Sequence, residues 1–218
     1  MKQLVSHKMN LSAAEKRWLP VFGSNGKLQL GWSCFLNRQL YPVIEQIFEG
    51  IASTRVEILQ QWATSHWQHL DELAAQCGES DSSQWSDLLL RRKDQVGDFS
   101  ELFIVDCEGQ LLTSTHAARK GQMHSGKLLT KALQEGLKKP FLHGPYADPV
   151  TLELGASTSS FHDAVTLMFY QPLTQKGKVI GCIAGRVPND VIGDLIQREA
   201  GHVYPESGDN YIFMVKAG

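Results

Sequence analysis

The sequence predicts an α+β protein in which a long helix precedes a small antiparallel sheet with flanking helices. A helical pattern of apolar residues runs from about Tyr41 to Ala75. Further along, two short apolar segments flank a tight turn at Gly109, and two longer ones flank a turn at Gly177, as in β-hairpins. Shorter helical patterns lie between and after these hairpins, so we expect helices to cover the sheet.

The composition is ordinary for a folded globular protein. Of the 218 residues, 42% are hydrophobic and 20% are charged, which allows a core and argues against disorder. The net charge of -2 supplies no positive field that would attract nucleic acid. The 4 cysteines are scattered without CxxC spacing, so we expect free thiols rather than a zinc site or a disulfide framework. No metal and no cofactor is predicted.

Two features of the sequence indicate where in the cell the protein lies. The N-terminus lacks the basic, apolar and small-residue pattern of a signal peptide. No apolar run approaches the roughly 20 residues that a membrane helix needs. As written, the sequence therefore predicts a cytoplasmic protein.

Helices dominate the predicted N-terminal part. Ser12 to Glu15 form a capping box that opens a short helix ending near Gly23, and Pro42 suits the first turn of the long helix. The apolar stripe of the long helix consists of Leu40, Ile44, Ile47, Ile51, Ile58, Trp62 and Leu70. At 1.5 Å per residue this helix would be roughly 50 Å long. Its stripe therefore packs either partly on a partner subunit or entirely on its own domain, and the pattern favours neither.

The remaining elements follow in order. A second helix is predicted from about Gln84 to Lys93, with Trp85, Leu88 and Leu89 as its buried face. The predicted strands are Leu102–Val105, Gln110–Ser114, Ala164–Leu173 and Lys178–Val187. Between the hairpins we predict a helix from about Lys127 to Lys138, with Leu128, Leu129, Ala132, Leu133 and Leu137 on its apolar side, and a loop at Gly144–Pro149. After the hairpins come a helix from Pro188 to about Glu199 and an apolar strand at Tyr211–Val215.

Two patterns resemble functional motifs but lack a required part. Gly121 to Lys127 matches a phosphate-binding loop, yet Leu128 stands where that loop needs a hydroxyl group for Mg²⁺, and the surrounding order is not βαβ. A nucleotide-binding enzyme therefore remains only an alternative, and no catalytic residue is predicted. His66 and His69 share a helical face, and we interpret them as exposed histidines rather than metal ligands.

Polar side chains are predicted to converge where the strands end. In a curved antiparallel sheet with a helical cover, strand ends and the facing loop enclose one cavity. Arg186 can bind a carboxylate through two parallel hydrogen bonds, so we expect a small organic acid or amino acid. Alternation places Phe169 and Tyr170 on opposite faces, and only one of them can line the cavity. The predicted ligand-binding residues are Ser114, His116, Tyr146, Asp148, Tyr170 and Arg186.

Residues 101–196 resemble a Cache domain, the PAS-like extracytoplasmic sensor of bacterial chemoreceptors and related signalling proteins. The resemblance rests on ELFIVDCEGQLLTS at 101–114, GPYADP at 144–149 and GKVIGCIAGRV at 177–187. The long helix resembles the dimer-forming helix that leads into such domains. The Tyr, Arg and Trp-Tyr pattern of the amino-acid binders in this family is not recognisable in the chain.

The resemblance implies a five-stranded antiparallel sheet with helices packed on one side, a ligand pocket, a homodimer and a downstream signalling domain. It divides the chain into an N-terminal extension (1–36), the helices that lead into the sensor (37–98), the ligand-binding domain (99–200), and a linker with the first strand of a truncated second module (201–218). The implied function is small-molecule sensing in a methyl-accepting chemotaxis protein. The alternative outputs are a diguanylate cyclase or a histidine kinase. The alternative location is the periplasmic sensor region of an inner-membrane receptor.

Overall fold

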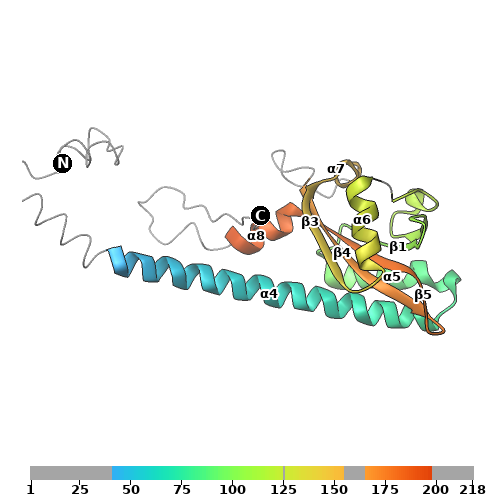
Figure 1. Ribbon diagram of the computed structural model, residues 1–218, viewed down its shortest axis with the longest axis horizontal. Helices are drawn as coiled ribbons and strands as arrows, with labels where there is room; N and C mark the ends of the chain where they lie inside the picture. Colours follow the sequence, from blue (N-terminus) through green and yellow to red (C-terminus); the bar gives the residue numbers. More distant parts are fainter. Residues whose placement is uncertain (1–40, 125, 155–164, 198–218) are drawn as a thin grey trace, which may run out of the picture. The chain divides into compact units, whose positions relative to one another are not determined.

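The computed structural model of the chain describes residues 41–124, 126–154 and 165–197. The helix predicted from Ser12 and the strand predicted at Tyr211–Val215 lie outside these residues. Figure 1 shows a long helix, a shorter helix, an antiparallel sheet and the helices that accompany it. Residues from Arg55 onward form one compact unit, which contains the sheet, and the helical residues before Arg55 belong to another.

The long helix α4 comprises Tyr41–Glu79 and confirms the helix predicted from the apolar stripe. Ile47 and Phe48 are exposed, whereas Leu70 and Leu73 are completely buried. Partly buried side chains from Leu59 onward pack against the core of the sheet domain. The C-terminal part of the stripe therefore belongs to the domain's own core. Within the described ranges, no helix combines the length and the apolarity that crossing a bilayer demands.

The helix α5 (Trp85–Val96) follows the short helix η2 (Ser82–Gln84) and packs back on the end of α4. Trp85 is buried, and its indole Nε1 donates a hydrogen bond to the carbonyl of Cys77 at 2.9 Å. Nη1 of Arg92 donates to a carboxylate oxygen of Glu72 at 2.9 Å. These contacts fix the two helices to each other before the chain enters the sheet.

The five-stranded antiparallel sheet confirms the predicted fold class. Its strands are β1 (Glu101–Asp106), β2 (Leu111–Ser114), β3 (Phe141–Ala147), β4 (Val165–Gln175) and β5 (Lys178–Pro188), in the spatial order β2-β1-β5-β4-β3. Gly109 between β1 and β2 has φ +94°, and Gly177 between β4 and β5 has φ +75°. Both glycines adopt the left-handed conformation that a tight hairpin turn requires, as the sequence predicted.

The strand β3 corrects the prediction of a loop at Gly144–Pro149. Residues Phe141 to His143 and Tyr146 to Ala147 pair with β4, and the register shifts between the two segments at the cis peptide bond of Gly144–Pro145. Proline has no N–H for a ladder, and it is tolerated here because β3 is an edge strand. The GP pair therefore marks a bulge inside a strand rather than a loop. The helix α7 (Pro149–Glu153) follows directly.

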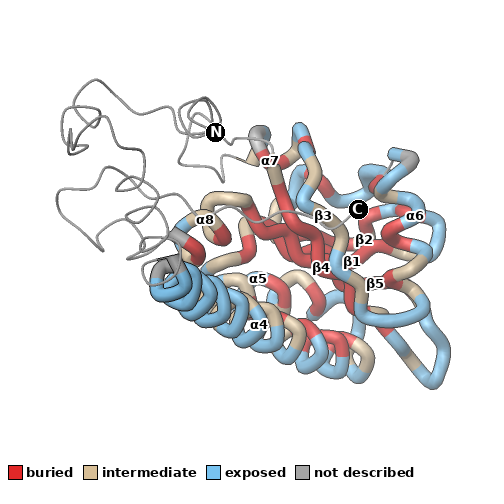
Figure 2. The backbone as a smooth tube through the Cα atoms, turned by 60° about the vertical axis from the view of Figure 1, so that its left-hand side comes forward, coloured by how far each residue is buried: buried red, intermediate tan, exposed pale blue. Residues whose placement is uncertain are grey.

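Helices pack on both faces of the sheet, not on one. The helices α4, α5 and α8 (Asn189–Gln197) contribute to a core with Ile104, Phe169 and Ile183. On the opposite face, α6 (Lys127–Gly136) packs Ala132 and Leu133 against a smaller core. The buried residues of both cores gather in and around the sheet (Figure 2). Tyr170 and Phe169 lie in different cores, which confirms the predicted alternation.

The helix α6 differs from its prediction in one residue of its buried face. Leu128 was placed on the apolar side, but it is 61% exposed. The buried face of α6 is instead formed by Ala132, Leu133 and Gly136. A Cβ atom on Gly136 would lie 2.5 Å from Cβ of Tyr170, so this glycine allows the helix to approach β4 closely.

Gly185 provides a test of how tightly the larger core is packed. A Cβ atom at this position would lie 2.5 Å from Cε1 of Phe99, whose ring is itself buried between β5 and neighbouring aromatic rings. We expect Gly185→Ala to lower the free energy of unfolding by about 1–3 kcal/mol in urea denaturation, because overpacking forces side chains off their preferred rotamers.

The matched control for this substitution is Gly50→Ala in α4. No atom lies within 4 Å of the added Cβ there, and the residue is helical. Helix propensity alone should then raise the free energy of unfolding by about 0.5–1 kcal/mol. Equal effects of the two substitutions would contradict tight packing of Phe99 on β5.

Candidate ligand-binding site

Charged side chains are buried on the face of the sheet that α6 covers. Side chains alternate along a strand, so Glu101 shares a face with Phe103, and Arg186 shares one with Ala184. Glu101 and Arg186 are also direct partners across β1 and β5, and both are 0% exposed. The sheet register therefore places a carboxylate beside a guanidinium in the interior.

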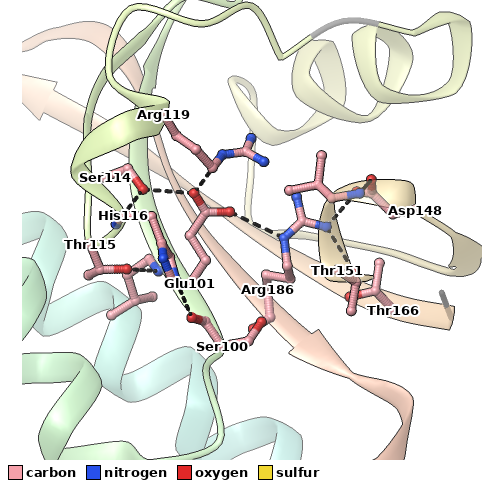
Figure 3. A network of polar contacts seen from close by, with 12 residues as sticks. Ser100, Glu101, Ser114, Thr115, His116, Arg119, Asp148, Thr151, Thr166 and Arg186 are labelled. Carbon is pink, nitrogen blue, oxygen red and sulfur yellow. Dashed lines mark hydrogen bonds and ion pairs between the residues drawn. The ribbon is translucent and has the colours of Figure 1, made fainter. Parts of the chain in front are cut away.

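The Glu101 carboxylate joins three segments of the chain (Figure 3). Its Oε1 accepts a hydrogen bond from Oγ of Ser114 at 2.7 Å and lies 2.9 Å from Nε of Arg119. Its Oε2 accepts a hydrogen bond from Nε of Arg186 at 3.2 Å. Ser114 ends β2 and Arg119 lies in the short helix η3 (Ala117–Arg119), so one carboxylate ties β1 to β2, to η3 and to β5.

The guanidinium of Arg186 also contacts the start of α7. Its Nη1 donates to Oδ2 of Asp148 and, at 3.1 Å, to Oγ1 of Thr151. Asp148 further accepts hydrogen bonds from the Tyr146 hydroxyl and from the N–H of Val150, each at 3.0 Å. We call Glu101, Asp148, Arg119 and Arg186 the ionic network. Its two carboxylates and two guanidinium groups balance in charge.

Both ends of the Arg186–Asp148 pair are charged at neutral pH. Burial raises the pKa of Asp148, but the Arg186 guanidinium and the hydrogen bonds together lower it by more than burial raises it. The pKa of Asp148 therefore lies below its ordinary value. Burial lowers the pKa of Arg186, but Asp148 and the other neighbouring groups raise it more. The pair is therefore a buried salt bridge whose charges neutralise each other.

His124 and Tyr170 form a second buried polar pair beside the ionic network. Nε2 of His124 and the hydroxyl of Tyr170 are hydrogen-bonded at 2.7 Å, and the imidazole lies 5.2 Å from the ring of Phe103. Burial lowers the pKa of His124 to about 4, and the Arg186 and Arg119 cations also lower it. Burial raises the pKa of Tyr170 above its ordinary value. At neutral pH the imidazole is uncharged and the phenol keeps its proton.

Five of the six predicted ligand-binding residues lie on this face. Arg186 and Asp148 belong to the ionic network, Ser114 and Tyr146 donate hydrogen bonds to it, and Tyr170 lies beside it with His124. Arg186 was expected to bind a ligand carboxylate through two parallel hydrogen bonds, but two of its donor atoms, Nε and Nη1, are hydrogen-bonded to protein oxygens.

His116 is positioned differently from the other predicted residues. Its Nε2 donates a hydrogen bond to the carbonyl of Ser100 at 3.1 Å, and its backbone N–H donates to Oγ of Ser114 at 3.0 Å. The residue therefore supports the end of β2 and the entry to β1. It contacts the ionic network through Ser114 and through its carbonyl, which accepts the backbone N–H of Arg119 at 2.9 Å.

The sequence analysis missed Glu101, Arg119, His124 and Thr151. Strand alternation could have identified Glu101, because it shares a strand face with the apolar residues Phe103 and Val105. Arg119 and His124 lie in segments without a regular period, and Thr151 lies in a helix of a single turn. The local sequence carries no signal that these three side chains turn inward.

The sequence analysis expected both histidines of α4, His66 and His69, to be exposed, but the structure does not confirm this. His66 is 3% exposed, packs against the rings of Phe99 and Phe169, and donates from Nδ1 to the carbonyl of Trp62 at 2.8 Å. Its Nε2 lies 3.2 Å from a carboxylate oxygen of Asp98. His69 is half-buried and contacts Arg92. Across the described part of the chain, no group of three or more His, Cys, Asp or Glu side chains could hold a metal ion.

The segment Gly121–Lys127 does not have the context of a phosphate-binding loop. Its first residues follow η3 and lie beside β2, where the carbonyl of Gln122 accepts the N–H of Leu111 and Gln110 forms a bridge with Met123. A phosphate-binding loop connects a strand of a parallel sheet to its helix. The sheet here is antiparallel, so the structure gives no support to the nucleotide-binding alternative.

A hollow of about 350 Å³ also lies along α4, lined by Glu57, Gln60, Gln61, Thr64, Ser65 and Gln68. These are polar side chains of one helix, and a single helix cannot enclose a small molecule from several sides. The ionic network, in contrast, combines groups from β1, β5, η3 and the residue before α7 on the opposite face of the sheet. We therefore regard the face that carries the ionic network as the candidate ligand-binding site.

No protein-family model matches the chain. The search of curated proteins likewise found no match. Solved structures do share its fold. An extracellular ligand binding receptor from Desulfohalobium retbaense has a TM-score of 0.54 at 16% identity, over 68% of this chain and 26% of the receptor. The sensory domain of the Campylobacter jejuni chemoreceptor Tlp3 has a TM-score of 0.58 at 14% identity, over 77% of this chain and 69% of that one.

A third example is the ligand-binding domain of the Pseudomonas aeruginosa amino acid chemoreceptor PctC in complex with GABA. It has a TM-score of 0.54 at 15% identity, over 73% of this chain and 66% of that one. The long helix followed by a five-stranded sheet is thus the fold of solved chemoreceptor sensory domains. The five-stranded antiparallel sheet implied by the resemblance to Cache domains is confirmed, with helices on both of its faces rather than on one.

Proposed function

We propose that this chain is the ligand-sensing domain of a chemotaxis receptor and binds a small polar metabolite that carries a carboxylate. The observation that supports this most directly is the ionic network, buried with the His124–Tyr170 pair on one face of a chemoreceptor-type sheet. Hydrophobic and aromatic surroundings with a few convergent polar groups are typical of small-molecule sites. We place the site in the segment 99–200, with Ser114, Tyr146, Asp148, Tyr170 and Arg186 around it and His116 at its edge.

The known ligands of the structural neighbours fit this proposal. Tlp3 has been solved in complex with L-valine and PctC in complex with GABA, and each of these molecules carries a carboxylate. For this chain, a carboxylate is favoured by the buried guanidinium groups, which bind such groups through charge-assisted hydrogen bonds. The described residues contribute no catalytic constellation to this face, so binding without turnover is the simplest function.

We propose that signals leave the domain through α4 in a homodimer. Val43, Ile47, Phe48 and Val56 expose apolar side chains along this helix. Exposed apolar residues at helical spacing are typical of helix–helix interfaces. Whether the output is a chemotaxis transducer, a diguanylate cyclase or a histidine kinase depends on the domain to which the helices connect. The extracellular neighbour favours the periplasmic side of a membrane for a receptor of this kind.

A melting screen of the purified chain against a metabolite library tests the proposed function. A true ligand at about 100 times its Kd should stabilise the fold by about 2.7 kcal/mol, which corresponds to a rise in Tm of roughly 5–10 °C. We expect at least one small carboxylate to produce such a rise, and Tyr146→Phe to reduce it, because the substitution removes the hydroxyl that holds Asp148. A library without any stabilising compound would reject the proposed function.

A further inference from the structure

Arg119 is buried and has N–H groups that no described residue accepts. The residue is 7% exposed, and its one charged partner is Glu101, through Nε at 2.9 Å. That contact has the distance of an ion pair but not the geometry of a hydrogen bond. Within the described ranges, no hydrogen bond or ion pair engages Nη1 or Nη2 of this guanidinium. Only Nε is both buried and without a hydrogen bond, so Nη1 and Nη2 are not enclosed by the fold and can be reached by an acceptor from outside it.

The position of the Arg119 guanidinium suits a ligand. Figure 3 shows it extending past the Glu101 carboxylate on the side toward Arg186 and Asp148. His124 lies on the same face, with its ring centroid 5.2 Å from that of Phe103 and its Nε2 hydrogen-bonded to Tyr170. The guanidinium also lies against the ring of Phe103, with its central carbon 6.0 Å from the ring centroid. The free amino groups therefore lie in the same region as the proposed site.

Arg186, by contrast, is held by two carboxylates. Its Nε donates to Glu101, and its Nη1 donates to Asp148 and Thr151. A ligand that took Nε or Nη1 would have to displace one of these buried acceptors, and an unpaired buried carboxylate would be left behind. Arg119 can accept a ligand without breaking any hydrogen bond of its own.

We propose that Arg119 is the residue that binds the anionic group of the ligand, and that Glu101, itself held by Arg186, is the positioning residue for its guanidinium. This inference rests on the proposed ligand-sensing function and specifies its chemistry. The terminal amino groups of Arg119 form the fork that matches the two oxygens of a carboxylate.

The charges of the ionic network limit the charge of the ligand. Glu101 and Asp148 already balance Arg119 and Arg186, so an anionic ligand adds its charge to a buried, neutral group. One negative charge is compensated by the direct hydrogen bonds from Arg119, whereas a second would have no cation of its own. The ligand class is therefore a molecule with one carboxylate rather than a dicarboxylate or a phosphate.

Acid–amide pairs test this inference, because an amide keeps the shape of the acid and removes its negative charge. The probes are acetate and acetamide, propionate and propionamide, L-alanine and L-alaninamide, and succinate with its monoamide succinamate. Binding is followed by the saturable rise in Tm of the full chain at matched ionic strength and neutral pH. We expect at least one monocarboxylate to bind at least tenfold more tightly than its amide, and succinamate to bind more tightly than succinate.

The variants separate the role of Arg119 from that of the fold. Arg119→Gln should abolish the preference for the acid, and Arg119→Lys, which keeps a cation beside Glu101, should retain only part of it. Arg91→Gln, the same substitution at an exposed arginine of α5, should leave the preference unchanged. If Arg119→Gln does not fold, the result with Arg119→Lys decides, because an undiminished preference in that variant would overturn the proposal.

Other outcomes are equally decisive. Equal binding of acid and amide, tighter binding of succinate than of succinamate, or no binding of any probe would overturn the role assigned to Arg119. A metabolite library whose only hits are neutral or cationic would reject this inference and leave the sensing function standing. A library without hits would reject both.

Discussion

Arg186→Met should lower the free energy of unfolding by about 3–5 kcal/mol, the largest effect we expect from a single substitution in this domain. Methionine preserves most of the side-chain volume but leaves Glu101 and Asp148 without their shared cation. Both carboxylates are almost completely buried, at 0% and 4% exposure. Removing one partner of a buried ion pair is strongly destabilising because the remaining charge is desolvated and uncompensated. Urea denaturation near pH 7 measures the loss.

Acidic pH provides an internal control for this prediction. The Arg186 cation holds the pKa of Asp148 below its ordinary value against the effect of burial, so in the wild type this carboxylate adds stability that is lost as pH falls through its folded pKa. In Arg186→Met the pKa of Asp148 should rise above its ordinary value, and protonation at low pH should then relieve the buried charge. The difference between variant and wild type should therefore shrink as pH falls.

The matched substitution Arg91→Met tests whether the loss is specific to the ionic network. Arg91 is exposed on α5, and removal of an exposed charge usually changes stability by no more than about 0.5 kcal/mol. A loss below about 1 kcal/mol for Arg186→Met would show that the ionic network does not hold the sheet face together.

The sequence predicted the elements whose pattern is local. The stripe of α4 and the two hairpins depend on helical spacing and on glycines that take positive φ, and both signals are contained in a few neighbouring residues. The strand β3 was missed because its defining contact is with β4, far away in the sequence. Proline and glycine at its centre then suggested a loop. Edge position, which makes the proline acceptable, is a property of the assembled sheet.

The site shows the same division between local and non-local information. Ser114, Tyr146 and Arg186 were found because polar residues at strand ends point to a common edge. Arg119 and His124 were not found, since only the folded loop after β2 turns them toward the sheet. The role expected of Arg186 depended on free donors, and the structure shows that Glu101 and Asp148 occupy two of them. Sequence patterns can place a charge near a site, but its partners decide what it can bind.

The two faces of the sheet are connected at the entry to β1. Nε1 of Trp62 donates to Asp98 at 2.8 Å, and His66 of the same helix also contacts this carboxylate. Two residues further on, the N–H of Ser100 donates to the carbonyl of Arg186, and Glu101 then enters the ionic network. A ligand that shifted the ionic network would thus act on the segment that α4 holds through Trp62, and this provides a direct physical link between the proposed site and the proposed signalling helix.

The free energy of unfolding should fall by about 3 kcal/mol between pH 7 and pH 4 because of His124. Burial, with a further contribution from Arg186, lowers its pKa from 6.5 to about 4 in the folded protein. Between these two pKa values, His124 is protonated in the unfolded chain but neutral in the folded protein. The free energy of unfolding therefore decreases as pH falls through 6.5, and most of this decrease is reached near pH 4. At about 1.4 kcal/mol for each pH unit, the total reaches about 3 kcal/mol.

His124→Gln isolates this contribution, because glutamine can hydrogen-bond to the Tyr170 hydroxyl but does not titrate. Urea denaturation at a series of pH values should show a markedly flatter dependence in the variant than in the wild type. Some dependence should remain, since burial also lowers the pKa of His66, although the Trp62 carbonyl and Asp98 act against it. If the two proteins lost stability in parallel from pH 7 to pH 4, His124 would have to be charged in the folded state, and the neutral imidazole beside Tyr170 would be ruled out.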